Sequence, residues 1–474
     1  MSSVAVERRA LREASIVAPA LALATAVAFL LSRTLPDVGG KPWHEDEAVA
    51  GLISAQPLGD LLHTVLLDRG GAPLHFLLTH MAFAVDASPQ TLRWLSLVFA
   101  LATIPLCYDL ARRVAGPFAG ATAAALAATS QLLTVYASFG RMYSLFAFAS
   151  VLSLDLFVRA VDHPTRRTLI GAAVSALVPL AVHPFGVFVF AAELAVAIWL
   201  WRLRALPLAL LAVPFTLPYL RLPGRFDPDA GMSAPEAALR ALGGSAGGYG
   251  IGLVAFAALA AIGAWRLPRT HAALGLLLIV LPPAALAVAG SDKLSPRHLI
   301  FMLPVWTTFV AAGVARLPAR GAVAAVIVLA AAIAPGAVAD PRTTTPGSAD
   351  AVAAPAAWLR ANVHRGDVLY PYSAVFLAAL PDTAVARPLP REPVALRRAL
   401  GGAGDIRRVL VAIPLRRPLD RAVPGGHVFR SWLILEHRGP FATLPAQLAR
   451  LAPTLRGTSA YSGLLQLRGA ACGC

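Results

Sequence analysis

Residues 271–290 read His-Ala-Ala-Leu-Gly-Leu-Leu-Leu-Ile-Val-Leu-Pro-Pro-Ala-Ala-Leu-Ala-Val-Ala-Gly, a run without a single aspartate, glutamate, lysine or arginine. About 20 mostly apolar residues in a helix are enough to cross the hydrocarbon core of a bilayer, which is roughly 30 Å thick. Ten further apolar runs lie at residues 14–32, 94–111, 117–136, 142–160, 168–183, 185–201, 205–220, 249–265, 298–315 and 321–339. The sequence therefore predicts an all-α polytopic membrane protein with about 11 transmembrane helices.

The composition of the whole chain agrees with this interpretation. Of its 474 residues, 57% are hydrophobic and only 14% are charged, and the mean hydropathy is +0.67. An average globular chain has roughly 25% charged residues, so a water-soluble globule is excluded. The chain contains 3 cysteines, too few for a small fold that depends on several disulfides.

Arginine dominates the net charge of +16, because the chain contains 39 Arg and only 2 Lys. Arginines beside apolar spans usually face the cytoplasm. Arg8, Arg9 and Arg12 precede the first span, and this apolar run lacks a convincing Ala-x-Ala cleavage site before the polar sequence begins. We therefore expect a signal anchor in the plasma membrane with a cytoplasmic N-terminus. No basic stretch is interleaved with aromatic residues, so nucleic-acid binding is not expected.

The later arginine clusters indicate that one short apolar segment does not cross the membrane. These clusters are Arg112–Arg113, Arg166–Arg167, Arg202 with Arg204, Arg266 with Arg269, and Arg316 with Arg320. They fall on the cytoplasmic side only if residues 72–86 stay outside the membrane core. The apolar part of that segment is about 12 residues, roughly 18 Å of helix, which is too short to span. Residues 33–93 are thus expected to form a long first extracytoplasmic loop, with 72–86 at the outer membrane interface.

The character of the chain changes after residue 340. Residues 1–340 hold all the spans, and residues 341–349 form a Pro/Thr-containing linker. Residues 350–474 contain shorter apolar runs, of which 368–372, 408–413 and 431–435 have the length of strands, and residues 351–361 read as a helix. We expect a small extracytoplasmic α/β domain here, because eleven spans that start inside end outside.

Acidic side chains gather in the first loop, where His44-Glu45-Asp46-Glu47 follows the first span. Adjacent carboxylates repel, and partial burial raises the pKa of such a group. A carboxylate of this kind suits a general base that takes a proton from a hydroxyl. The alternative for the same pattern is a solvated acidic loop without a chemical role.

Other polar residues are expected on the same face of the membrane as the acidic cluster. They are His75 in the interfacial segment, Arg141 before the fourth span, His183 in an outer turn, and Lys293, Arg297 and His298 before the tenth span. Arginine offers fork-shaped donors for phosphate oxygens, and lysine adds a compact charge. The set predicts a site for a phosphate-bearing lipid. For any single arginine, snorkelling to the lipid headgroups is the alternative.

The ordered motifs resemble the GT-C superfamily of membrane glycosyltransferases, in particular bacterial members similar to the protein O-mannosyltransferases and the RgtA/B/C/D-like group. The matching motifs are Asp46-Glu47, Ala72-Pro-Leu-His-Phe76, Arg93-Trp-Leu-Ser96, Ala111-Arg-Arg-Val-Ala-Gly116, Arg141-Met-Tyr-Ser-Leu145 and Ser295-Pro-Arg-His298. They cover roughly residues 10–315.

The resemblance implies transfer of a hexose-type sugar from a polyprenyl-phosphate donor to an extracytoplasmic acceptor, which is a glycan, a lipid or a protein of the cell envelope. It implies that Asp46 is the catalytic base and that Glu47 binds the acceptor or orients Asp46. The substrate-binding residues that it implies are His75, Arg141, Tyr143, His183, Lys293, Arg297 and His298. Neither a metal nor a cofactor is expected.

Two other functions remain open at this point. Asp155 and Glu193 lie within apolar spans, and intramembrane acids often mark the pathway of a transporter or lipid flippase. Against this, the sequence has no repeated halves and no corresponding broken helices. Glu193 is also suited to a structural pair between helices. The third function is a non-catalytic membrane assembly protein whose C-terminal domain binds envelope polymers.

Overall fold

The computed structural model describes residues 3–40, 43–69, 71–221, 233–245, 251–289, 294–338, 349–380, 385–402 and 406–473. The chain divides into two compact units that each combine distant stretches of sequence. The first unit consists of residues 1–38 and 93–341, and the second of residues 39–92 and 342–474. The expected linker at 341–349 lies almost entirely outside the described residues.

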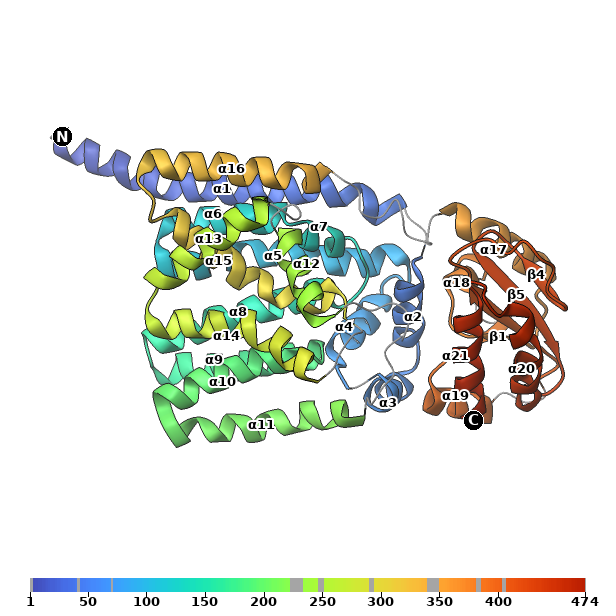
Figure 1. Ribbon diagram of the computed structural model, residues 1–474. Helices are drawn as coiled ribbons and strands as arrows, with labels where there is room; N and C mark the ends of the chain where they lie inside the picture. The colour runs from blue at the N-terminus through green and yellow to red at the C-terminus, as the bar shows by residue number, and fades with distance from the viewer. Residues whose placement is uncertain are drawn as a thin grey trace. The chain divides into compact units, whose positions relative to one another are not determined.

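The first unit is helical (Figure 1). Its α-helices are α1 (Ser3–Gly40), α5 (Pro89–Ala115), α6 (Pro117–Thr129), α7 (Gln131–Ala137), α8 (Tyr143–Asp162), α9 (Arg166–Val182), α10 (Gly186–Trp201), α11 (Leu206–Thr216), α12 (Ala234–Ser245), α13 (Ile251–Arg266), α14 (Arg269–Val288), α15 (Leu303–Val314) and α16 (Ala319–Val338). Short 3₁₀ helices are η1 (Arg202–Ala205), η2 (Leu217–Arg221) and η3 (Pro296–Met302).

Each of the eleven expected spans coincides with helical structure, which confirms an all-α polytopic membrane protein. Within the described ranges, 6 helices are long and apolar enough to cross a bilayer, or 7 if a bent pair counts as one span. One of the six, Gly186–Tyr219, covers two of the expected runs. The helices α9 and α13 have 17 and 16 residues and are not among these six.

The bent pair is α6 and α7, which the sequence predicts as one span at 117–136. The two helix axes meet at 58°. Ser130 causes the break, because its backbone is extended and its hydroxyl accepts a hydrogen bond from the Leu133 N–H at 3.4 Å, so that it caps a new helix. A single hydroxyl within an apolar run does not reveal such a break in advance.

Glycines allow α13 and α15 to pack with their backbones in contact. A Cβ added at Gly263 meets the Phe309 carbonyl oxygen at 2.0 Å, and one at Gly313 meets the Leu259 carbonyl oxygen at 2.0 Å. Small residues at helix contacts are the usual means of close packing in membranes.

We therefore expect Gly263→Ala or Gly313→Ala to destabilise the first unit by about 1–3 kcal/mol or more, because the helices must separate. Thermal denaturation in detergent micelles measures this effect. Gly171→Ala in α9 is the matched control, since a Cβ there meets nothing within 4 Å. A melting temperature that is equally unaffected in all three variants contradicts the packing role.

The second unit contains a mixed five-stranded sheet between two layers of helices. Its elements are α2 (Glu45–Ser54), α3 (Leu58–Asp68), α4 (Leu74–Phe83), α17 (Ala349–Asn362), β1 (Asp367–Tyr370), α18 (Ala374–Ala379), β2 (Ala386–Pro388), α19 (Pro393–Gly401), β3 (Arg408–Pro414), β4 (Gly426–Val428), β5 (Trp432–Arg438), η4 (Phe441–Thr443), α20 (Leu444–Leu455) and α21 (Tyr461–Cys472). The strand order is β2-β1-β3-β5-β4. β1 pairs in parallel with β2 and β3, whereas β5 is antiparallel to β3 and β4.

Side chains alternate between the two faces of the sheet, as the pleat requires. One face packs on α17 and α18, and the other packs on α19, α20 and α21. In β3, for example, Leu410 faces the first layer, and Val409 and Val411 face the second. This arrangement confirms the small C-terminal α/β domain, including its helix at 351–361 and its three predicted strand runs.

The first long loop forms three short helices, α2, α3 and α4, and belongs to the second unit. The sequence groups residues 33–93 with the membrane spans because they are continuous with them. In the structure, however, residues 39–92 pack with the C-terminal residues. α4 has only 10 residues, about 15 Å of helix, which agrees with the predicted short segment at 72–86. Its position relative to a membrane stays a prediction.

Candidate active site

The acidic cluster forms the first turn of α2 rather than an irregular loop. His44 is the N-cap, and its Nδ1 accepts a hydrogen bond from the Asp46 N–H at 3.1 Å. In return, Glu47 Oε2 accepts from the His44 N–H at 3.0 Å, which completes a capping box. Three carboxylates in a first turn are also favoured by the helix dipole. The pattern His-Glu-Asp-Glu is therefore in part a helix start signal.

The three carboxylates have different surroundings. Glu47 is 1% exposed and takes part in the cap, whereas Asp46 is half-buried. Burial raises the pKa of Glu45 to about 7, although the Ala374 N–H that it accepts lowers that pKa and the charge of Asp46 raises it further. Glu45 is therefore a carboxyl of the cluster with a raised pKa.

This pKa leads to an expected pH dependence. An ordinary glutamate has a pKa of 4.5, so between this value and about 7 the folded protein binds more protons than the unfolded chain. The free energy of unfolding should therefore fall as the pH rises from about 5 to 8. Glu45→Gln should remove this part of the dependence, because an amide does not titrate in this range. The amide oxygen can still accept from Ala374, so the hydrogen bond is retained. Melting temperatures of both proteins across this range measure it, and equal slopes contradict the assignment.

His75 lies beside the acidic helix within the second unit. It is the second residue of α4, which packs against α2, and it is 2% exposed. Its ring contacts Phe76 edge to face, with 5.6 Å between ring centroids. Phe76 in turn belongs to the apolar cluster that contains Ala48, Ile53 and other residues of α2.

In the first unit, four of the predicted substrate-binding residues form a cluster of rings and one guanidinium. The ring centroids of Tyr143, His183 and His298 are 5.8–6.2 Å apart. The Arg297 guanidinium carbon lies 5.5 Å from the Tyr143 ring centroid, a cation–π distance. The charges of Arg141 and Arg297 both act on His183, so Arg141 belongs to the same neighbourhood.

Each member of this cluster stands at the end of a helix. Tyr143 begins α8. His183 caps the C-terminus of α9, and its Nδ1 accepts from the Phe185 N–H at 3.1 Å. Arg297 and His298 open η3, where His298 Nδ1 accepts from the Ser295 N–H at 3.3 Å. These residues lie close together because the ends of α8, α9 and η3 converge.

Aromatic residues that the sequence analysis did not select surround the cluster. Phe146 stacks on His183 with 4.9 Å between centroids, and Phe185 contacts His298 at 5.4 Å. Tyr136 lies 4.8 Å from Tyr143. Their only signal in the sequence is proximity to Arg141 and His183 at the ends of spans. Guanidinium groups among aromatic rings are well suited to bind a phosphate with its lipid.

The remaining predicted residue, Lys293, lies outside the described residues. The acidic helix with His75 lies in the second unit, and the aromatic–cationic cluster lies in the first. Among the residues that the structure describes, no group of three or more His, Cys, Asp or Glu side chains is placed to hold a metal ion.

The two intramembrane acids have structural partners. The Ser153 hydroxyl donates its one hydrogen to the Glu193 carboxylate, and the Ser153 oxygen lies 2.8 Å from Oε1 and 2.9 Å from Oε2. Asp155 forms ion pairs with Arg113 at 3.1 Å and Arg159 at 2.7 Å. The bond between Ser153 and Glu193 is the structural pairing between helices that the sequence left open for Glu193.

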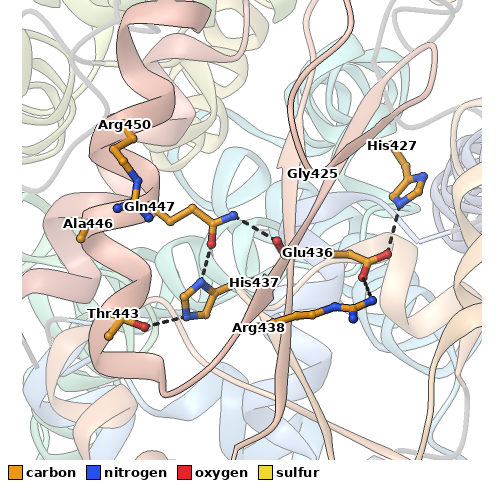
Figure 2. Close-up of a pocket in the computed structure, with 9 residues that line it drawn as sticks. All are labelled: Gly425, His427, Glu436, His437, Arg438, Thr443, Ala446, Gln447 and Arg450. Atoms are coloured by element: carbon orange, nitrogen blue, oxygen red, sulfur yellow. Dashed lines mark hydrogen bonds and ion pairs between the residues drawn. The ribbon is translucent and has the colours of Figure 1, made fainter.

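A cavity of about 680 Å³ opens in the C-terminal domain (Figure 2). It is lined by Gly425, His427, Glu436, His437, Arg438, Thr443, Ala446, Gln447 and Arg450. Figure 2 shows that some of these side chains bond to one another: His437 contacts Gln447 and Thr443, and Glu436 contacts His427. None of the residues predicted for the active site lines this cavity.

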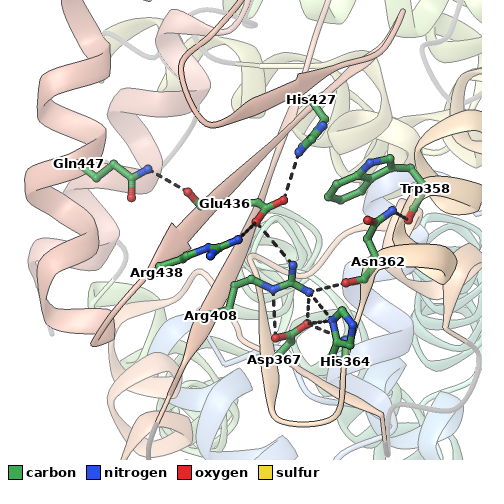
Figure 3. Close-up of polar contacts among 9 residues, drawn as sticks. All are labelled: Trp358, Asn362, His364, Asp367, Arg408, His427, Glu436, Arg438 and Gln447. Atoms are coloured by element: carbon green, nitrogen blue, oxygen red, sulfur yellow. Dashed lines mark hydrogen bonds and ion pairs between the residues drawn. The ribbon is translucent and has the colours of Figure 1, made fainter.

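An ion-pair network continues from the wall of this cavity into the sheet (Figure 3). Arg408 pairs with Asp367 at 2.5 Å and with Glu436 at 3.5 Å, so one guanidinium connects β1, β3 and β5. The bonds to Asp367 raise the pKa of Arg408. The network therefore stabilises the domain rather than exposing a reactive group.

The chain is similar in fold to solved structures. ArnT from Cupriavidus metallidurans in the apo state superimposes with a TM-score of 0.56 and 12% identity over 89% of this chain and 98% of that chain. Its structure bound to undecaprenyl phosphate gives a TM-score of 0.55 and 13% identity over 88% and 97%. The oligosaccharyltransferase AglB from Archaeoglobus fulgidus, in complex with an inhibitory peptide and a dolichol-phosphate, gives a TM-score of 0.51 and 13% identity over 83% and 69%.

The chain has the fold of the GT-C membrane glycosyltransferases. This result confirms the fold that the resemblance implied. No family model matches the chain, and no curated protein matches it. Because the identities are 12–13%, the similarity concerns the GT-C fold, and the roles of individual residues must be argued from their own geometry.

Proposed function

We propose that this chain is a membrane glycosyltransferase that uses a polyprenyl-phosphate sugar as donor. The observation that carries the proposal is the cluster of Tyr143, His183, Arg297 and His298 in a GT-C fold. Arginine pairs with phosphate oxygens in a bidentate way, and aromatic walls accommodate the lipid. Arg141 adds a second guanidinium to this neighbourhood.

In the proposed reaction an acceptor hydroxyl attacks C1 of a hexose-type sugar. The new bond joins C1 to the acceptor oxygen, and the bond between C1 and the phosphate oxygen breaks. Asp46 takes the hydroxyl proton, and polyprenyl phosphate leaves with the bonding electron pair. Arg141 and Arg297 stabilise the charge that develops on the phosphate, with Lys293 or His298 in a supporting role. The bonding of Glu47 in the helix cap suits it to orient Asp46.

The proposed acceptor is a glycan, a lipid or a protein of the cell envelope. The proposed orientation has a cytoplasmic N-terminus, with residues 33–93 and the C-terminal domain outside the cytoplasm. Cysteines introduced at 87–90, in a variant without native cysteines, test the orientation with an impermeant thiol reagent. Labelling that requires permeabilised cells contradicts it.

The experiment that tests the function combines two measurements. Purified protein in nanodiscs is incubated with a panel of polyprenyl-phosphate hexoses and an extract of envelope acceptors, and sugar transfer is followed by mass spectrometry. In parallel, the glycans and glycolipids of a deletion strain are compared with those of the parent strain. Transfer from one donor, and loss of the same sugar in the deletion strain, support the proposal. An unchanged profile and no turnover with any donor refute it.

A further inference from the structure

The acidic helix α2 is too short to be stable by itself. It has 10 residues, and isolated helices below about 12–15 residues are marginal in water. Its apolar side chains are buried in a cluster that also contains residues of the C-terminal domain. This cluster comprises Trp43, Ala48, Ala50, Leu52, Ile53, Leu61, Val65, Phe76, Leu92, Tyr372 and Ala374. The conformation of α2 therefore depends on residues more than 300 positions away in the sequence.

A carboxylate of α2 bonds directly to the C-terminal domain. Glu45 Oε2 accepts a hydrogen bond from the Ala374 N–H at 3.1 Å. Ala374 is the first residue of α18, where the first amides of a helix have no partner inside the helix. The residue that directly precedes Asp46 in α2 is thus attached to the start of α18.

The end of α3 is attached to the same domain by a buried carboxylate. Asp68 is 5% exposed, and its two oxygens accept from the Val394 N–H at 3.3 Å and the Ala395 N–H at 2.7 Å. Both amides belong to the first turn of α19, whose dipole favours a negative charge. A buried carboxylate requires such donors, because its desolvation is otherwise costly.

Further contacts surround these two carboxylates. The buried Glu392 pairs with Arg69, and Tyr372 bonds to Gln56. At the exposed edge, Asp60 pairs with Arg398 at 2.8 Å, with side chains that are 41% and 50% exposed. An exposed pair contributes little to stability. The buried contacts therefore determine how the loop helices sit on α18 and α19.

We propose that the C-terminal domain positions the candidate catalytic helix, and that Glu45 and Asp68 are the positioning residues that attach α2 and α3 to it. Both neighbours of Asp46 are fixed, Glu45 by Ala374 and Glu47 by the His44 N–H. The proposal rests on the proposed function of Asp46 as the base. It extends that function by giving residues 349–473 a role in catalysis that acts through α2.

The test compares two changes of the same kind within α3, in full-length protein in nanodiscs. Asp68→Asn replaces one acceptor oxygen by an NH2 group, which cannot accept a hydrogen bond from the backbone N–H groups of α19. Asp60→Asn makes the same chemical change at the exposed pair and is the matched control. We expect Asp68→Asn to increase the hydrogen exchange of the α2 amides about tenfold or more, since bonds to a charged group are strong. We also expect kcat to fall about tenfold with an unchanged KM for the donor, and Asp60→Asn to change neither quantity.

Protection of the β3 and β5 amides shows whether the domain itself remains folded. If Asp68→Asn unfolds it, Gln56→Ala replaces that variant, because it removes the contact with Tyr372 together with the hydrogen bond that Gln56 accepts from Thr64, and leaves Asp68 in place. Faster exchange in α2 without a loss of kcat overturns the positioning role, and unchanged exchange overturns the attachment itself. If the α2 amides of the wild-type protein exchange slowly but the protein transfers no sugar, the proposed function and the role in catalysis are refuted. The attachment of α2 to the C-terminal domain then still stands.

Discussion

Asp46→Asn is expected to slow sugar transfer by about 10²–10⁴-fold, which is the usual cost of removing a general base. The fold should be retained, because Asp46 is half-buried and contributes its backbone N–H, rather than its carboxylate, to the helix cap. Binding of the polyprenyl-phosphate donor should also persist. Single-turnover transfer and donor binding, measured on the same preparation, separate the two effects.

Glu45→Gln is the variant that decides the assignment of the base. Burial raises the pKa of Glu45 to about 7, and a base is most effective when its pKa lies near the working pH. The carboxylate of Glu45, however, is engaged with Ala374. If Glu45→Gln or Glu47→Gln abolishes transfer while Asp46→Asn is nearly normal, another acid of the cluster is the base. If all three variants remain active, the cluster is only the start of a helix.

Arg297→Lys is expected to weaken donor binding by about tenfold or more, even though it preserves the positive charge. A guanidinium forms two parallel bonds to phosphate oxygens, whereas an ammonium is a point charge. The replacement also removes the guanidinium that lies over the ring of Tyr143. Competition between the labelled donor and unlabelled polyprenyl phosphate gives both affinities.

The control for this prediction is Arg316→Lys, because Arg316 is an exposed arginine beyond the other end of α15. It should leave donor affinity unchanged. Arg141→Lys should behave like Arg297→Lys, since both charges act on His183. If neither replacement alters donor affinity, these arginines serve as membrane anchors and the phosphate site lies elsewhere.

The fold was largely predictable because hydrophobic length is a direct physical requirement of a bilayer. The run at 271–290 predicts α14, and the strand-length runs at 408–413 and 431–435 predict β3 and β5. The break at Ser130 was not predictable, because one hydroxyl in an apolar run gives no sign of its backbone conformation. The hydropathy that predicts a span is an average over many residues, whereas the bend depends on the backbone conformation of a single residue.

The candidate site was predictable in its residue types but not in its partners. Arg141, His183 and His298 stand out because only 14% of the residues are charged and the chain has only 11 histidines. The capping box of His44 and Glu47 also has a local signature, three residues apart. The bond from Glu45 to Ala374 joins residues 329 positions apart. No local pattern encodes such a contact, so the raised pKa of Glu45 could be placed only with the structure.

The bond between Glu45 and Ala374 also sets an order of events during biosynthesis. The segment that carries the acidic helix emerges from the ribosome early, but its partner follows 329 residues later, after all the apolar spans have been translated. Until then α2 has neither its hydrogen-bond donor on α18 nor the apolar cover of Tyr372 and Ala374. The nascent chain therefore inserts its spans before the acidic helix is complete, and a chain that ends before α18 is released without a fixed Asp46.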